Sequence, residues 1–120
     1  MPKEWFRNTV VKMRYGLTLD LKNDPKLINE YIAYHQNVWP EIKESIVLSG
    51  IENMEIYHIH TRLFMVIDVN ENFSFEKKGE TDKSNEKVQE WEQLMDIYQQ
   101  RLPFAKPDEK WVVMDKIFQL

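Results

Sequence analysis

The sequence predicts an α+β fold of the ferredoxin-like class, in which helices cover one face of a four-stranded antiparallel sheet in the order βαββαβ. Three observations lead to this prediction. An alternating apolar segment comes first, two amphipathic helical regions follow it, and two strand-like segments lie between those regions. The chain has 120 residues, which is enough for one hydrophobic core. We therefore expect residues 1–12 to form an N-terminal arm and residues 13–120 to form a single domain.

The first strand and the first helix are predicted from periodicity and capping. Residues 13–21 alternate between apolar and polar side chains, and this period of two is typical of a half-buried strand. Asn23 and Asp24 precede Pro25, which places capping side chains before a proline at the first helical position. A helix is therefore expected over residues 25–37.

Two strands are predicted in the middle of the chain, after a second helical piece. Pro40 interrupts the first helix because its ring nitrogen carries no hydrogen. The next helical piece is expected over residues 41–49, and Gly50 is expected to end it in a left-handed backbone conformation. Residues 53–59 and 63–69 have strand patterns, and the tight connection between them predicts a hairpin.

The last third of the chain predicts one long helix and one strand. Residues 70–84 are mostly polar and are expected to form a loop or a short helical excursion. Residues 86–102 have apolar residues at steps of three and four, which predicts a helix with Gln99 and Gln100 pointing mostly outward. A last strand is predicted over residues 110–118. Both of its faces are apolar, which indicates that one face meets another subunit.

Composition argues against several kinds of partner. The net charge of −4 and the isoelectric point of about 5.4 argue against nucleic acid, which requires a clustered basic surface. No apolar run approaches the length of a membrane span, and charged residues near the N-terminus do not fit a signal peptide. Cysteine is absent, so disulfides and thiolate metal sites are excluded. We expect a cytoplasmic protein that binds neither membrane nor nucleic acid.

Signatures of several enzyme classes are absent from the sequence. There is no Gly-x-Ser-x-Gly elbow, no phosphate-cradling glycine motif and no dinucleotide fingerprint. His58 and His60 share one face of a predicted strand near Glu55, but neither a helical histidine pair nor a cysteine pair supports a metal site. We therefore expect no metal and no cofactor.

Acid–base catalysis is the enzyme chemistry that the sequence leaves open, and residues 31–41 are the candidate segment for it. Tyr31 and His35 are four residues apart, so they share one face of a helix, and Trp39 follows one turn later if the helix continues. An imidazole titrates near neutral pH, and aromatic rings beside it suit a small polyhydroxylated ligand. Aromatic residues that face a core would give the same spacing. The residue pattern therefore leaves both interpretations open.

The segment Tyr31-x3-His35-x3-Trp39-Pro40-Glu41 resembles the L-rhamnose mutarotase family, whose members share Tyr-x3-His-x3-Trp-Pro-Glu on their first helix. Other positions are similar to the family's central hairpin, second helix and last strand. These are Gly50, Asn53, Ile56-Tyr57, Leu63-Phe64, Gln89-x-Trp91-x3-Met95, Pro103 and Phe118-x-Leu120. The resemblance covers residues 14–120.

This resemblance implies a dimeric α+β barrel of two ferredoxin-like subunits that interconverts the α and β anomers of a 6-deoxyhexose without a cofactor. It also implies that His35 is the proton donor, that Tyr31 contacts the sugar, and that Trp91 lines the sugar pocket. Opening a pyranose requires protonation of the ring oxygen and removal of the anomeric hydroxyl proton. In this interpretation Tyr31, Trp39 and Trp91 stack on the C–H face of the sugar.

Two substitutions relative to the family pattern bear on the choice of sugar. Glu92 stands where the family has the second residue of a tryptophan pair, and Met54 replaces a sugar-contacting tyrosine on the second strand. Both positions are expected to contact the substrate. The substitutions therefore leave open which 6-deoxyhexose binds, and L-rhamnose, L-fucose and another 6-deoxyhexose are all candidates. A non-catalytic sugar-binding module and a dimeric ferredoxin-like monooxygenase are the alternative functions.

Overall fold

The computed structural model describes residues 13–120, so the predicted arm lies outside the described residues. The elements in this range follow one another as β1 (Met13–Leu21), α2 (Pro25–His35), α3 (Pro40–Leu48), β2 (Ile51–Ile59), β3 (Arg62–Val69), α4 (Phe75–Lys83), α5 (Glu86–Asp96), β4 (Gln99–Gln100) and β5 (Val112–Val113). In the described part of the chain, no helix is both long and apolar enough to cross a membrane.

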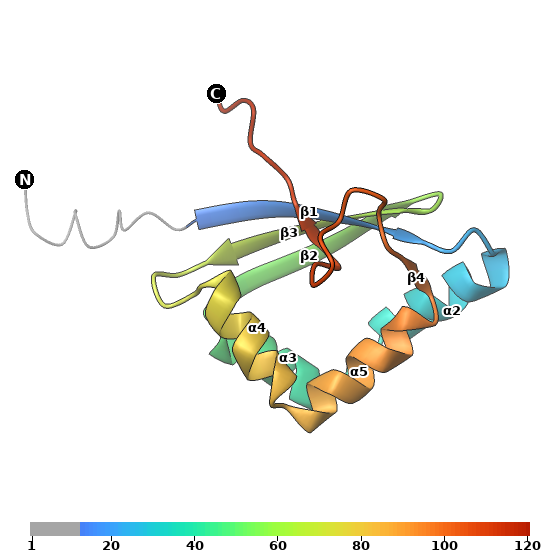
Figure 1. Ribbon diagram of the computed structural model, residues 1–120, viewed down its shortest axis with the longest axis horizontal. Helices are drawn as coiled ribbons and strands as arrows, with labels where there is room; N and C mark the ends of the chain where they lie inside the picture. Colours follow the sequence, from blue (N-terminus) through green and yellow to red (C-terminus); the bar gives the residue numbers. More distant parts are fainter. Residues whose placement is uncertain (1–12) are drawn as a thin grey trace, which may run out of the picture.

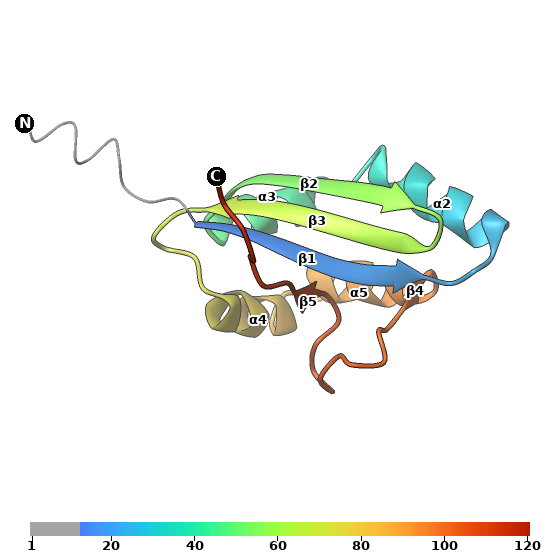
Figure 2. The same ribbon diagram turned by 90° about the horizontal axis from the view of Figure 1, so that it is seen from above.

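The strands form one antiparallel sheet, and the helices lie on one side of it (Figure 1). The strand order is β2-β3-β1-β4, and β5 also pairs with β1. Seen from above the sheet, α2 and α3 lie on the β2 side and α4 and α5 lie on the β1 side (Figure 2). This arrangement confirms the predicted ferredoxin-like α+β fold.

The register of β1 and β3 decides which side chains face the helices. Leu19 pairs with Leu63 and Leu17 pairs with Met65, and all four side chains are buried. Because side chains alternate along a strand, every second residue of both strands contributes to this covered face. The core therefore lies between the sheet and the helices.

The predicted helix boundaries are confirmed where capping decides them. The Asp24 carboxylate accepts a hydrogen bond from the Lys26 backbone N–H at 2.9 Å, and Pro25 is the first residue of α2. Gly50 follows α3 with a φ of 101°, a conformation that side chains with a Cβ rarely adopt. A Cβ at Gly50 would also lie 2.6 Å from Asn70 Oδ1. Glycine is therefore required at this turn.

The predicted helix over residues 86–102 is wrong after residue 96. The helix α5 ends at Asp96, and the chain then pairs with β1 through β4. The Lys22 backbone N–H donates a hydrogen bond to the Tyr98 carbonyl at 2.9 Å. The free edge of β1 thus provides backbone partners that replace further helical hydrogen bonds.

The predicted last strand over residues 110–118 is also wrong, since β5 contains only Val112–Val113. The Met114 backbone N–H donates to the Gly16 carbonyl at 2.7 Å, and the chain then leaves the sheet with Ile117 and Phe118 exposed. A longer strand would need cover on both of its apolar faces, and residues 13–120 supply none beyond residue 114. The region at 70–84, expected as a loop or short helix, contains α4.

The face of the sheet opposite the helices, here called the open face, presents aromatic side chains to solvent. Tyr57 and Phe64 stack there with ring centroids 6.4 Å apart, and they are 55% and 39% exposed. The Phe64 ring lies over Gly16, where a Cβ would meet it at 3.0 Å. Two ion pairs flank the aromatic residues on the same face, Arg14–Asp68 and Arg62–Asp20. The open face therefore combines an apolar centre with charged flanks.

Candidate active site

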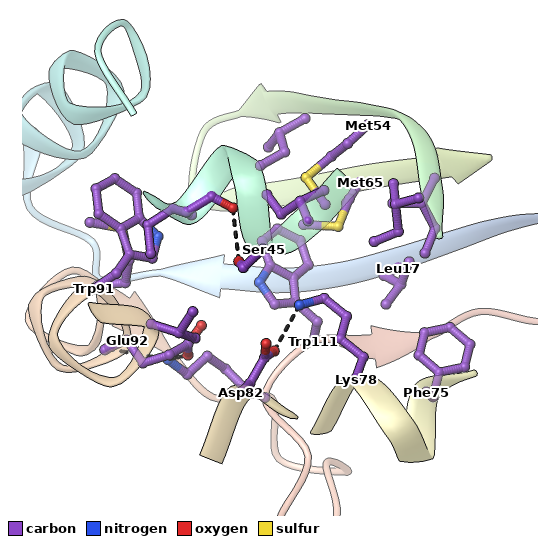
Figure 3. Close-up of a pocket in the computed structure, with 18 of the residues that line it drawn as sticks. Leu17, Ser45, Met54, Met65, Phe75, Lys78, Asp82, Trp91, Glu92 and Trp111 are labelled. Carbon is purple, nitrogen blue, oxygen red and sulfur yellow. Dashed lines mark hydrogen bonds and ion pairs between the residues drawn. The ribbon is translucent and has the colours of Figure 1, made fainter. Parts of the chain in front are cut away.

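A cavity of about 960 Å³ lies between the covered face of the sheet and the helices. Five of the six residues predicted from the sequence line it: Tyr31, His35, Met54, Trp91 and Glu92. The view in Figure 3 shows Met54 and Met65 on the sheet side and Trp91 and Glu92 on the α5 side. The structure therefore brings together residues from α2, β2 and α5 that are far apart in the sequence.

His35 is the last residue of α2, and its ring is held by the preceding helical turn. Its Nδ1 lies 2.8 Å from the carbonyl oxygen of Tyr31. Because a carbonyl oxygen only accepts hydrogen bonds, Nδ1 carries a hydrogen and Nε2 is the nitrogen left for a ligand. Burial lowers the pKa of His35 below its ordinary value of 6.5, against a smaller opposing effect of the hydrogen bond to Tyr31. The imidazole is therefore neutral at neutral pH, with a lone pair on Nε2.

Tyr31 supports His35 from the middle of α2. The two rings lie 4.3 Å apart between centroids, and the phenol oxygen of Tyr31 accepts a hydrogen bond from Gln99 Nε2 at 3.3 Å. Burial raises the pKa of Tyr31 to about 12. The phenol thus keeps its proton at neutral pH and acts as a hydrogen-bonding group.

Trp91 forms an aromatic wall of the cavity. Its ring meets His35 edge-on at 5.6 Å and Trp39 at 5.1 Å. Trp39 is not a lining residue. It stands before α3 and packs behind Trp91, with Lys87 Nζ 5.8 Å from its ring. The two tryptophans therefore differ in position: Trp91 faces the cavity and Trp39 supports it.

The two positions that depart from the family pattern have different surroundings. The Glu92 carboxylate pairs with Lys110 Nζ at 2.6 Å, and the same ammonium group reaches Asp96 at 2.7 Å. Met54 lies on the covered face of β2, where it packs against the core cluster that contains Met65. Glu92 is thus held by an ion pair at the cavity edge, whereas Met54 contributes apolar surface.

Among the lining residues that sequence reasoning did not place at the site, Gln99, Lys110 and Trp111 bear most directly on its chemistry. Gln99 was expected to point outward from a helix, but it belongs to β4 and is buried. Trp111 was assigned to a regular strand, whereas its half-buried ring packs against both core clusters and lies within the cavity (Figure 3). Only the size and apolar character of Trp111 signalled burial. No periodic signal marks Gln99, because the end of α5 is decided by pairing with β1.

The histidine pair considered for a metal lies at the hairpin. His58 Nε2 is within hydrogen-bond distance of the His60 carbonyl oxygen, and His60 has a φ of 54° at the turn. Among residues 13–120, no group of three histidine, cysteine, aspartate or glutamate side chains is placed to hold a metal ion.

Comparisons with known proteins show the family to which the chain belongs. The family model for L-rhamnose mutarotase matches residues 14–120. The chain is 39% identical to a UPF0734 protein of Dictyostelium discoideum over 114 residues, which cover 88% of each chain. It is 38% identical to an L-fucose mutarotase of Xanthomonas campestris pv. campestris over 109 residues, 89% of this chain and 87% of that one. The fold is similar to a crystal structure of an L-rhamnose mutarotase from Formosa agariphila, with a TM-score of 0.66, 20% identity, and coverage of 90% of this chain and 98% of that one. The chain therefore belongs to the L-rhamnose mutarotase family and is an isomerase of the mutarotase type.

Proposed function

We propose that this enzyme interconverts the α and β anomers of L-fucose, with L-rhamnose as the second candidate substrate. The observation that carries the proposal is the position of His35, which lines the cavity together with Tyr31 and Trp91 and whose Nε2 makes no hydrogen bond within residues 13–120. The choice of L-fucose rests on the Xanthomonas L-fucose mutarotase, which is 38% identical over most of both chains. The L-rhamnose mutarotase of known structure is 20% identical and supports the fold.

In the proposed mechanism, His35 moves one proton between two oxygens of the sugar. Neutral Nε2 takes the proton of the anomeric hydroxyl, and the bond between C1 and the ring oxygen breaks to leave an aldehyde. The imidazolium then protonates the ring oxygen. After rotation about the C1–C2 bond, the reverse steps close the ring on the other face of the aldehyde. His35 is thus the base first and the proton donor second.

The surroundings of His35 favour this proton cycle. Because burial lowers its pKa, the imidazolium that forms is a stronger acid than free imidazolium and returns the proton readily. The ring of Trp91 offers an apolar face for the C–H groups of a sugar. The Tyr31 phenol keeps its hydrogen and is available to a hydroxyl group. Ring opening of this kind needs only proton transfers, so His35 and its neighbours provide the groups that the reaction requires.

The substrate assignment predicts accelerated anomer exchange, measurable by NMR saturation transfer between the two anomeric protons. We expect the largest acceleration with L-fucose and a smaller one with L-rhamnose. L-Galactose is the matched control sugar, because it differs from L-fucose only by a hydroxyl at carbon 6. Acceleration of neither 6-deoxyhexose would reject the proposal. Binding of L-fucose without faster exchange would instead support a non-catalytic sugar-binding module.

We further propose that two copies of residues 13–120 pair through the open face. An exposed apolar centre formed by Tyr57 and Phe64 is typical of an interaction surface. The C-terminal segment rises on the same side of the sheet (Figure 1) and carries exposed apolar residues such as Ile117 and Phe118. A second copy placed face to face with this sheet would cover both groups.

The dimer is tested by replacing Phe64 at the centre of the open face. Phe64→Asp is expected to convert a particle of two chains into one of about 14.6 kDa, because two carboxylates would be buried against each other. Light scattering after size-exclusion chromatography measures the mass. Leu48→Asp on the exposed end of α3 is the matched control and is expected to leave the dimer intact. A wild-type protein of one chain would contradict the proposal.

A further inference from the structure

Gln99 places a buried amide in the wall of the cavity, beside Tyr31. Its side chain is 8% exposed, and its Nε2 donates to the Tyr31 phenol oxygen at 3.3 Å. Its Oε1 is sealed from solvent and has no hydrogen-bond partner within residues 13–120. A buried amide oxygen without a donor is unfavourable, since it loses its hydrogen bonds to water and gains none in return.

The two amide atoms of Gln99 differ in their partners. Nε2 is held by the Tyr31 phenol, whereas Oε1 has no hydrogen-bond partner among residues 13–120. A leucine or methionine would fill the same space without this penalty. Packing alone therefore does not account for a glutamine here.

We propose that Gln99 is a sugar-binding residue, whose unpaired amide atom forms a hydrogen bond with one hydroxyl group of the substrate. The terminal torsion of glutamine has a broad energy profile, so a small rotation would bring this atom to the cavity surface. A sugar hydroxyl both donates and accepts hydrogen bonds, and it satisfies the amide in either orientation. This inference rests on the proposed sugar mutarotase function.

The other amide atom gives Gln99 a second effect, on the direction of the Tyr31 phenol. Because Nε2 donates to the phenol oxygen, the phenol hydrogen points away from Gln99. Tyr31 itself lines the cavity, so this hydrogen is available to a neighbouring hydroxyl group of the ligand. Gln99 and Tyr31 would together recognise hydroxyl groups on one side of the sugar, with His35 beside them at the anomeric centre.

The first test replaces Gln99 with methionine, which has a similar length and no amide. We expect kcat/KM for L-fucose to fall about tenfold to a hundredfold, the range for losing one hydrogen bond in a buried site. The melting temperature should change little, because the substitution removes the unpaired oxygen together with the hydrogen bond from Nε2 to Tyr31. Gln100→Met is the matched control, since Gln100 lies next on β4 with an exposed side chain. It should change neither quantity.

The second test identifies the bonded hydroxyl group with analogues of L-fucose that lack the 2-, 3- or 4-hydroxyl. In the wild-type enzyme, loss of one of these groups should lower kcat/KM about tenfold or more. In Gln99→Met the same loss should have no further effect, and Gln99→Leu provides the same comparison if Gln99→Met does not fold. Equal penalties in wild type and variant for all three analogues would overturn the inference. That outcome differs from failure of the proposed function, in which the wild-type enzyme does not accelerate exchange.

Discussion

Replacing His35 with alanine is expected to lower the catalysed rate of anomer exchange by about 10²- to 10⁴-fold, the usual contribution of a positioned acid–base group. His35 is half-buried at the end of α2, and within residues 13–120 its side chain is bonded only to the Tyr31 carbonyl of its own helix. Its removal should therefore leave the fold in place, as circular dichroism and the melting temperature would show. Saturation-transfer NMR on L-fucose measures the loss.

His58→Ala is the matched control, because it removes an imidazole from the exposed hairpin instead of the cavity. Its exchange rate should equal that of the wild type.

The proposed proton transfers also predict how the rate of anomer exchange depends on pH. The active form is neutral His35 with a pKa below 6.5, so the rate should be full at neutral pH and fall as the pH drops through this pKa. A folded His35→Ala enzyme with wild-type exchange, or a rate that rises on acidification, would contradict the role given to His35.

Replacing Trp91 with alanine is expected to lower the free energy of unfolding by about 3–5 kcal/mol, as is typical when a buried tryptophan is truncated. Trp91 is 7% exposed and packs with Tyr34, His35 and Trp39. Truncation would remove an aromatic contact from each of them and join the space left behind to the cavity. Urea denaturation followed by circular dichroism measures the change.

Trp91→Phe separates the stability effect from the effect on the site. It keeps an aromatic ring against His35 and Trp39, so its loss of stability should be clearly smaller than that of Trp91→Ala. Both variants should show weaker sugar binding, since the proposed stacking surface becomes smaller or disappears. If the free energy of unfolding of Trp91→Ala lies within about 1 kcal/mol of the wild-type value, the packing of Trp91 does not stabilise this side of the cavity.

The parts of this fold that follow local patterns were predictable from the sequence. The bounds of β1 follow from an alternation of nine residues, and the start of α2 follows from Asp24 and Pro25. The edge of the sheet was not predictable in this way. It is shared by β4 and β5, and their pairing with β1 joins residues about 80 to 100 positions apart in the sequence. Sequence patterns reflect only residues that are near one another in the chain. They therefore predicted a helix up to residue 102 and a strand up to residue 118.

Some contacts in the site were also predictable from the sequence, and others were not. The contact between Tyr31 and His35 follows from their spacing on one helix, so the residue pattern alone anticipated it. The approach of Trp91 to His35 requires α5 to pack beside α2, and spacing along the chain does not contain that information. Gln99 was missed because its burial depends on where α5 ends. Long-range packing therefore decided the positions of Trp91 and Gln99 in the cavity, which spacing along the chain did not reveal.

The division of the sheet edge into β4 and β5 has a consequence for how substrate range can change. The segment 101–111 leaves the sheet between these two short strands, and it supplies Lys110 and Trp111 to the cavity before the chain returns to β1. The central pairing of β1, β2 and β3 does not involve this segment. Insertions, deletions and exchanges within 103–109 should therefore be tolerated by the folded sheet, whereas Leu102 and Trp111 at the two ends of this stretch are constrained by packing, as are β2 and α5. Under the proposed function, changes in this loop are expected to alter sugar preference while His35 keeps its position.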